Sequence, residues 1–273
     1  MAHVTGSDPP RPVGVVLAAG AGSRLRPLTR QRPKALCPVG DRPLVDHALD
    51  RLAGAVDEVA VNVHHGRLLM EAHLTRPGRA VRPHVSVEEG DARGTAGALG
   101  LLRPWLDGRP VLVTNADAWL DLDVGAFVDG WDGERTRLLC VHDPRRGDFG
   151  PLRYCGVALM PWAAVAGLGP EPSGLYEAVW AGAARDGALD LVEHRGTFVD
   201  CGTVADYLEA NLRWSGGESV VGEGAAVGDG ARVERSVLWP DAVVRPGEVL
   251  VDAVRAGTTT VLVRPPPPFS QGG

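Results

Sequence analysis

The stretch that decides the fold runs from Val13 to Lys34 and reads VGVVLAAGAGSRLRPLTRQRPK. It begins with a β-branched apolar run, which is typical of a strand buried on both faces of a parallel sheet. Gly20 and Gly22 then interrupt the run, and a backbone without Cβ atoms can bring its N–H groups close to an anion. Arg24 and Lys34 follow as candidate partners of phosphate oxygens. The stretch predicts a polyphosphate site, although a plain turn with surface cations explains a GxG fragment alone.

Outward from this stretch, strand-like and helix-like segments alternate as in βαβ units. The patterns predict strands over 13–18, 58–63, 85–88 and 111–114, and helices over 44–53, 65–73, 94–102 and 204–212. In open parallel sheets, ligands gather at the carboxyl ends of the strands. Asp117 and Asp200 each follow an apolar run, and a carboxylate facing a triphosphate is a natural ligand for Mg²⁺. A turn is the alternative explanation for each.

A longer string, LAAGAGSRLRPLT with Arg32-Pro33-Lys34 and the LCPV and RPL segments after it, resembles the opening signature of the sugar-1-phosphate nucleotidyltransferases. It fits neither a P-loop nor a dinucleotide fingerprint, which needs a third glycine. The resemblance implies a doubly wound, Rossmann-like α/β domain with a mostly parallel sheet. It also implies that Ala19, Gly20, Gly22 and Arg24 hold the nucleoside triphosphate, while Lys34 neutralises phosphate charge during transfer, so that Arg24 and Lys34 are the catalytic cations.

The segments VTNAD and FVDCGT resemble the two metal-binding segments of the same family. The resemblance assigns Asp117 and Asp200 to Mg²⁺ and places Asn115 near the sugar. Two carboxylates on one Mg²⁺ would offset the charge of the α-phosphate and of the leaving pyrophosphate.

Residues 88–99, EEGDARGTAGAL, resemble the base-recognition segment of the family. Gly94 would let the backbone approach the base, and Thr95 could cap the following helix or touch the nucleotide. Glu89 is a weaker candidate for the edge of the base. A glycine-rich helix start is the alternative, and the segment does not choose between GTP and UTP.

The sugar side departs from many relatives, because no Glu-Lys-Pro segment occurs between residues 138 and 159. HDPRRGDF and YCGV stand there instead and resemble a shorter branch that includes the N-acetylmuramate-1-phosphate uridylyltransferases. Arg145 or Arg146 could replace the missing lysine, although a solvated loop is the simpler explanation. Gly156 matches the family's glycine beside the sugar. Glu177 fits a region that contacts a sugar hydroxyl in relatives, or is ordinary helix surface.

From Ser219 onward, valines recur with a spacing of six residues, at positions 221, 227 and 233 and then at 237, 243 and 249. This spacing predicts a parallel β-helix of about two coils, with a β-hairpin as the alternative. The segment resembles the left-handed β-helical tail of mannose-1-phosphate guanylyltransferases, which implies a homo-oligomer. We assign 1–12 to a flexible N-terminus, 13–216 to the nucleotidyltransferase domain, 219–263 to the β-helix and 264–273 to a Pro-rich tail.

Composition sets bounds on the class of protein. A chain of 273 residues with 44% hydrophobic content supports a substantial core. The net charge of −6 argues against a general affinity for nucleic acid. No apolar run is long enough for a membrane span or a signal peptide, and four scattered cysteines indicate reduced thiols, so we expect a cytoplasmic protein.

These observations predict an enzyme that uses Mg²⁺ to transfer a nucleotidyl group to a sugar-1-phosphate, releasing pyrophosphate. The base segment and the β-helix favour GTP and mannose-1-phosphate. Open alternatives are UTP with an N-acetylmuramate- or glucose-type 1-phosphate, or guanylyl transfer to a heptose or cyclitol phosphate. A regulatory subunit that binds nucleotide sugars without turnover is a further alternative, although Arg24, Lys34, Asp117 and Asp200 are all present.

Overall fold

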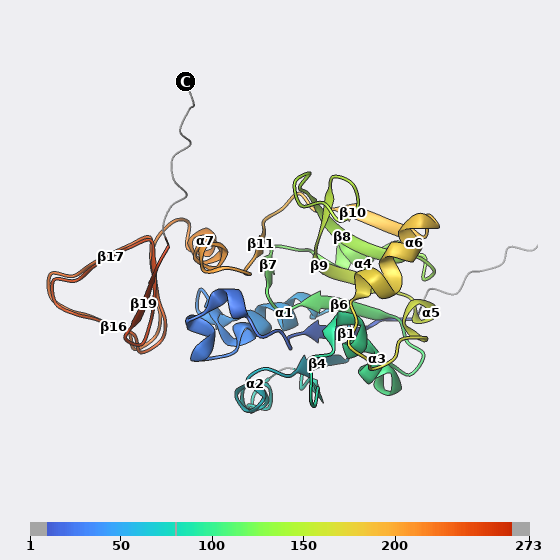
Figure 1. Cartoon of the computed structure of the whole chain (residues 1–273), viewed down its shortest axis with the longest axis horizontal. Helices are drawn as coiled ribbons and strands as arrows, with labels where there is room; N and C mark the ends of the chain where they lie inside the picture. Colours follow the sequence, from blue (N-terminus) through green and yellow to red (C-terminus); the bar gives the residue numbers. More distant parts are fainter. Residues whose placement is uncertain (1–9, 80, 264–273) are drawn as a thin grey trace, which may run out of the picture. The chain divides into compact units, whose positions relative to one another are not determined.

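The computed structural model describes residues 10–79 and 81–263 (Figure 1). The chain forms two compact units. The first contains the described residues up to Ala21 together with Arg32–Leu36 and Leu44–Phe198, and the second contains Gly22–Gln31, Cys37–Pro43 and the described residues from Val199 on. The expected flexible N-terminus and Pro-rich tail lie mostly outside the described residues, and the domain ranges 13–216 and 219–263 stay predictions.

A seven-stranded mixed sheet forms the centre of the first unit, in the order β10-β8-β9-β6-β1-β4-β5. Strand β9 pairs antiparallel with β6 and β8, and the other pairs are parallel. The predicted mostly parallel α/β sheet is therefore confirmed. Its strands are β1 (Val13–Leu17), β4 (Val59–Val63), β5 (His84–Val87), β6 (Val111–Asn115), β8 (Thr136–His142), β9 (Leu152–Met160) and β10 (Leu189–Glu193).

The connections between these strands contain the helices that the sequence patterns predict, with ends shifted by a few residues. The helix expected over 94–102 continues to Leu106. The remaining elements of this unit are α1 (Leu44–Leu52), α2 (Arg67–Leu74), α3 (Gly94–Leu106), the short strand β7 (Ala118–Leu120), α4 (Val124–Val128), α5 (Trp162–Val165), a π-helical turn (Tyr176–Trp180) and α6 (Ala181–Arg185).

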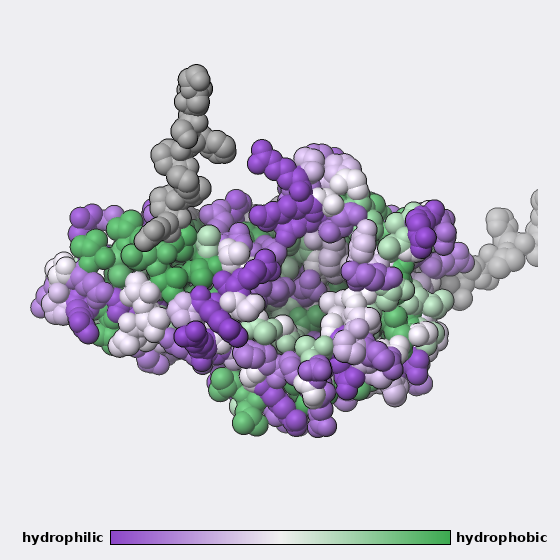
Figure 2. All heavy atoms as spheres, in the orientation of Figure 1, coloured by the Kyte–Doolittle hydropathy of each residue, from purple (hydrophilic) through white to green (hydrophobic). Residues whose placement is uncertain are grey.

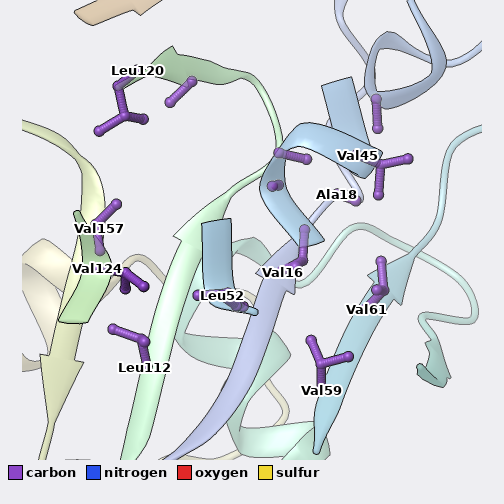
Figure 3. Close-up of a cluster of buried hydrophobic side chains, with 14 of the residues drawn as sticks. Val16, Ala18, Val45, Leu52, Val59, Val61, Leu112, Leu120, Val124 and Val157 are labelled. Carbon is purple, nitrogen blue, oxygen red and sulfur yellow. The ribbon is translucent and has the colours of Figure 1, made fainter. Parts of the chain in front are cut away.

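Strand β1 is buried on both faces of the sheet. Val13 and Val15 belong to the apolar cluster that includes α3, whereas Val16 belongs to the cluster that includes α1. Figure 3 shows Val16 beside Leu52 of α1, within the second of these clusters. Because successive side chains of a strand point to opposite faces, a strand covered on both sides must be apolar at every position.

The second unit contains α7 (Val204–Trp214), which begins where the hydroxyl of Thr203 accepts a hydrogen bond from the N–H of Asp206 at 3.2 Å. Within this unit the hydroxyl of Tyr207 donates to the carbonyl of Pro38, and Nε1 of Trp239 donates to that hydroxyl at 2.9 Å. This buried chain of hydrogen bonds connects α7 with the hairpin of β2 (Pro38–Val39) and β3 (Arg42–Pro43) and with the C-terminal strands.

The C-terminal strands form the predicted parallel β-helix of about two coils. Pairing partners lie seventeen residues apart along the chain, with Val220 opposite Val237 and Val237 opposite Val254. The final strand pairs antiparallel with its predecessor. The strands are β12 (Val220–Val221), β13 (Ala226–Val227), β14 (Arg232–Glu234), β15 (Val237–Leu238), β16 (Val243–Val244), β17 (Val249–Val251), β18 (Ala253–Ala256) and β19 (Thr259–Leu262).

Most of the valines that set the six-residue pattern lie outside the apolar interior of the β-helix, although Val237 is buried and Val233 packs against the interior. Leu238, Val244 and Leu250 are buried in it, and they also recur every six residues. Four of the six pattern valines are instead exposed, namely Val221, Val227, Val243 and Val249. Figure 2 shows hydrophobic surface over this part of the chain. The six-residue spacing therefore predicted the β-helix, and three of its valines, Val221, Val227 and Val233, pair with the buried Leu238, Val244 and Leu250.

Among the described residues, no helix has both the length and the apolar character needed to cross a membrane.

Candidate active site

A cavity of about 210 Å³ opens in the first unit, at the carboxyl ends of β1, β4, β5 and β6. This is the edge of the sheet at which ligands are expected to gather. Six residues proposed from the sequence line it together, and four further residues complete its wall. The predicted six are Ala19, Gly20, Gly94, Thr95, Asn115 and Asp117, and the others are Leu17, Asn62, Glu88 and Ala92.

Lys34 and Asp117 form an ion pair at this cavity, with 2.7 Å between Nζ and Oδ2. The Lys34 side chain is only 8% exposed, whereas that of Asp117 is 41% exposed. Lys34 begins a short 3₁₀ turn, Lys34–Leu36, and Asp117 follows the end of β6. A carboxylate that is open to the cavity and backed by a buried ammonium can face both a cation and phosphate oxygens.

The glycine loop that follows β1 leaves open space toward the cavity. A Cβ atom added to Gly20 would have no neighbour within 4 Å. Just before the loop, the N–H of Ala18 donates to Oδ1 of Asn62 at 2.6 Å, which fixes where the strand ends. The loop can therefore receive a ligand without displacing protein atoms.

Gly94 and Thr95 line the cavity and also hold a neighbouring segment of the first unit. Gly94 has a φ of 67°, and a Cβ there would lie 2.5 Å from the carbonyl oxygen of Ser173. The hydroxyl of Thr95 accepts a hydrogen bond from the N–H of Leu175 at 2.8 Å. Helix α3 begins at Gly94 without a side-chain cap, so the expectation that Thr95 caps it is wrong.

Asn62 and Glu88 are two cavity residues that sequence reasoning missed. Both are almost fully buried, with exposed fractions of 3% and 4%. Nδ2 of Asn62 donates to Oε1 of Glu88 at 2.7 Å, and Oε2 of Glu88 accepts from the N–H of Arg93 at 2.8 Å. A lone amide inside the apolar run VAVNV was the available signal for Asn62, whereas the sequence offered no signal that distinguishes Glu88 from Glu89.

The other predicted residues of the first unit lie outside the cavity lining. Glu89 has an 81% exposed side chain, and its Oε1 lies 3.8 Å from Nη1 of Arg67. Gly156 is next to the cavity residue Asn115, since a Cβ on Gly156 would lie 3.3 Å from that of Asn115. Glu177 is exposed on the π-helical turn.

The two arginines considered as substitutes for the missing lysine lie in an exposed loop. The backbone N–H groups of Arg145 and Arg146 each donate to Oδ1 of Asp143 at 3.2 Å. These bonds fix the backbone of the loop and leave the role of the two guanidinium groups as a prediction.

Three predicted residues, Gly22, Arg24 and Asp200, belong to the second unit. The carbonyl of Gly22 accepts from the N–H of Leu25 at 3.0 Å, which turns the chain into a short 3₁₀ segment, Ser23–Leu25. A Cβ on Gly202 would lie 2.9 Å from Nη2 of Arg24 and 3.1 Å from Oδ1 of Asp200. Within this unit, Gly202 therefore allows the predicted cation and the predicted carboxylate to approach the same stretch of backbone.

Comparison with known proteins places this geometry in a family. Residues 13–147 match the nucleotidyl transferase family. An N-acetylmuramate alpha-1-phosphate uridylyltransferase from Caulobacter vibrioides is 34% identical over 234 residues, which cover 74% of this chain and 96% of the relative. The chain belongs to the nucleotidyl transferase family. The family resemblance found in the sequence is thereby confirmed, and with it an enzyme of the nucleotidyltransferase type.

Two further proteins show how far the likeness to this nucleotidyl transferase extends. A mannose-1-phosphate guanylyltransferase catalytic subunit beta from Dictyostelium discoideum is 26% identical over 224 residues, covering 71% of this chain and 62% of that protein. A solved structure from Thermus thermophilus, named as a mannose-1-phosphate geranyltransferase, has a TM-score of 0.68 at 20% identity. It covers 93% of this chain and 95% of its own, so the likeness in fold includes the C-terminal part.

An oxygen donor at the cavity of this nucleotidyl transferase suits a hard cation. Among the residues that the structure describes, no group of three or more His, Cys, Asp or Glu side chains could hold a metal ion. Mg²⁺ commonly uses one or two carboxylates and completes its shell with water and substrate phosphates. Asp117, as an open carboxylate at the cavity, fits that mode of binding.

Two thiols of the first unit, Cys155 on β9 and Cys140 on β8, are buried. Burial raises the pKa of Cys155, next to Gly156, to about 12, with a smaller contribution from Cys140. Burial also raises the pKa of Cys140 to about 12. Because the thiolate is the nucleophilic form, burial lowers the reactivity of both thiols near neutral pH.

Proposed function

We propose that this nucleotidyl transferase joins the nucleotidyl group of a nucleoside triphosphate to a sugar-1-phosphate. A phosphate oxygen of the sugar phosphate would attack the α-phosphorus in line. The bond from that phosphorus to the bridging oxygen of the β-phosphate would break, and pyrophosphate would leave with the electron pair. The single observation that carries the proposal is the cavity that brings the glycine loop, Asn115 and Asp117 together at one edge of the sheet.

Lys34 and Asp117 would have different electrostatic roles in the transfer. Asp117 would hold Mg²⁺, and Lys34 would face the phosphate charge that develops during transfer. Bound Mg²⁺ supplies charge neutralisation at the α-phosphate and the leaving pyrophosphate. Arg24 as a triphosphate contact and Asp200 as the second metal ligand are carried into this proposal from the sequence.

Our preferred substrates are GTP and mannose-1-phosphate. Glu88 presents a carboxylate to the cavity wall, and a carboxylate only accepts hydrogen bonds when ionised. Its two oxygens have about four acceptor sites, of which Asn62 and Arg93 use two. Guanine offers adjacent N–H donors on one edge, whereas uracil offers a single N–H between two carbonyl groups. The likeness to a mannose-1-phosphate guanylyltransferase also supports this choice.

UTP with N-acetylmuramate-1-phosphate is the second candidate. The relative from Caulobacter vibrioides favours it, because it has the higher identity of the two relatives, 34%, and the match covers 96% of its length. The loop GDF at residues 147–149, between β8 and β9, resembles the same branch.

The deciding experiment is a measurement of pyrophosphate release with Mg²⁺ across a substrate grid. GTP, UTP, dTTP, ATP and CTP are crossed with mannose-, glucose-, N-acetylglucosamine-, N-acetylmuramate- and heptose-1-phosphates. We expect the largest kcat/KM for GTP with mannose-1-phosphate. A larger value for UTP with N-acetylmuramate-1-phosphate would select the second candidate. Nucleotide-sugar binding without any release would support the regulatory alternative.

We also propose that copies of the chain associate through the β-helix. Val221 and Val227 are 54% and 46% exposed, although they pair with the buried residues Leu238 and Val244 of the next coil, so the first coil leaves apolar surface without cover. Val221→Lys with Val227→Lys should lower the mass measured by light scattering, whereas Asp229→Lys, at an exposed position of the same coil, should not. An unchanged mass in the double variant would refute association through this face.

A further inference from the structure

A chain of hydrogen bonds crosses the wall of the cavity and connects its two loops. It starts at the N–H of Ala18, which donates to Oδ1 of Asn62 at 2.6 Å. Nδ2 of Asn62 donates to Oε1 of Glu88 at 2.7 Å. Oε2 of Glu88 then accepts from the N–H of Arg93 at 2.8 Å. Ala18 directly precedes the glycine loop, and Arg93 directly precedes Gly94 and Thr95.

The position of the pair in the sheet follows from strand alternation. Val59, Val61 and Val63 of β4 belong to the apolar cluster on the side of α1. Asn62 therefore points to the opposite face, toward the start of α3. Glu88 immediately follows β5, the neighbour of β4 in the sheet. An amide and a carboxylate on adjacent strands thus meet where the loops leave the sheet.

Fold stability explains why the pair accepts hydrogen bonds from the N–H groups of Ala18 and Arg93, but it does not require both side chains to line the cavity. Buried polar groups cost free energy unless they are hydrogen-bonded, and a well-packed apolar pair is often at least as stable as a buried polar one. Both side chains also line the cavity, although they make their bonds to one another and to the backbone. The pair therefore lies where it can act on a bound ligand.

We propose that Asn62 and Glu88 form a positioning pair that fixes the distance between the phosphate-binding loop and the base-binding loop. Asn62 orients the Glu88 carboxylate toward the nucleobase and at the same time fixes the end of β1 before the glycine loop. The pair thereby makes recognition of the base and of the triphosphate depend on each other. This inference rests on the proposed nucleotide site.

The chemistry of the pair allows a reciprocal exchange. Asn62→Asp places a second carboxylate against Glu88, so the donor is lost and two like charges face each other. Glu88→Gln introduces an amide against the amide of Asn62. In the double variant Asn62→Asp with Glu88→Gln, the new amide at position 88 can donate to the new carboxylate at position 62. The N–H groups of Ala18 and Arg93 keep their acceptors in that variant.

Equilibrium binding of GTP with Mg²⁺, measured by calorimetry, reads out the pair without any need for turnover. Asn62→Asp should raise the GTP dissociation constant about tenfold or more, because a donor is lost and two like charges face each other. The double variant should regain part of this loss and bind GTP at least about threefold more tightly than Asn62→Asp does, because the two positions act as a coupled pair.

Comparing the KM for the nucleotide with the KM for the sugar phosphate distinguishes a positioning role of the pair from a structural role. Asn62→Asp should raise the KM for the nucleotide and leave the KM for the sugar phosphate unchanged. Ser86→Ala is the matched control, because it removes a buried polar group from the same face of β5 outside the cavity lining. It should change the melting temperature without changing either KM.

Two results would overturn the inference. One is an unchanged GTP dissociation constant in a folded Asn62→Asp protein, and the other is a double variant no better than Asn62→Asp. If Asn62→Asp does not fold, Glu88→Gln and the double variant still provide the comparison. A wild-type protein that binds GTP but releases no pyrophosphate would contradict the proposed function while leaving this test intact.

Discussion

The large sheet of the first unit and the β-helix of the second both contain parallel strands, and the described cavity lies at strand ends of the sheet. In the sheet, helices connect successive strands, so backbone and polar groups of β1, β4 and β6 end together at one open edge. In the β-helix, short turns connect the strands, and each coil stacks directly on the next. Parallel pairing alone therefore does not make a site, because the connections decide whether strand ends stay open.

Close packing between coils is visible at the glycines of the turns. A Cβ on Gly222 would lie 2.5 Å from the backbone nitrogen of Pro240, and one on Gly228 would lie 2.4 Å from that of Pro246. A Cβ on Gly20 in the cavity loop would touch nothing. In the β-helix, the next coil leaves no room for a side chain at these glycines. In the cavity loop, the missing side chain of Gly20 leaves room for a ligand.

The largest expected effect is a loss of turnover when the charged residues at the cavity of the sheet are replaced. Lys34→Ala and Asp117→Asn should each lower kcat/KM by about 10²-fold or more, because the first removes a positive charge that faces the phosphates and the second weakens the proposed metal ligand. The unfolding free energy of Asp117→Asn should change little, since the new amide oxygen can still accept from Lys34. Asp121→Asn, at an exposed carboxylate four residues later, serves as the control in the same pyrophosphate assay. Near-normal turnover in Asp117→Asn would refute the metal assignment.

The next effect comes from the closed interior of the β-helix. Leu250→Ala should lower the unfolding free energy by about 2–5 kcal/mol, because Leu250 is 2% exposed. Val249→Ala, at the neighbouring residue that is 54% exposed, should change it by less than about 0.5 kcal/mol. Urea denaturation followed by circular dichroism measures both. Equal losses in the two variants would contradict the assignment of Leu250 to the interior and of Val249 to the outer face.

The two glycines sharpen the comparison further. Gly222→Ala should cost about 1–3 kcal/mol of stability through crowding of the next coil, and nucleotide binding should not change. Gly20→Ala should leave stability unchanged and weaken GTP binding about tenfold, because its methyl group would occupy the cavity where backbone approaches phosphate. Thermal melting measures the stability of both variants, and calorimetry measures their binding of GTP. A destabilised Gly20→Ala protein with normal GTP binding would reverse the assignment.

The smallest effect concerns a polar cluster of the first unit that has no part in the cavity. Burial tends to raise the pKa of Asp46, but hydrogen bonds to His73 and Arg79 outweigh it and lower that pKa. The folded-state pKa lies below the unfolded one, so the stabilisation is complete above the unfolded value and is lost as the pH falls through the folded value. Asp46→Asn should therefore reduce the dependence of melting temperature on pH in the acid range. The change in unfolding free energy should be smaller than that of Leu250→Ala. An identical acid profile in the variant would contradict this.

Much of the site could be predicted because its signals are local in the sequence. Gly20 lies just after the strand that ends near Ala18, and Asp117 lies just after the strand that ends at Asn115. Parallel strands bring their carboxyl ends to one edge of the sheet. The fold class followed from the same alternation of segments. Glu88 was missed in favour of Glu89 because the two are adjacent, and only the register of β5 decides which side chain turns inward.

The sequence by itself determined the βαβ alternation, the glycine loop, the family and the six-residue repeat, because each depends on residue type and spacing along the chain. Only the tertiary structure decided that Asn62 and Glu88 bond across the cavity wall and that Leu250 is buried where Val249 is exposed. Asn62 and Glu88 come from different strands, so their meeting depends on strand order and register. The two neighbours in the β-helix differ because alternation places them on opposite faces, and nothing in two adjacent apolar residues states which face is covered.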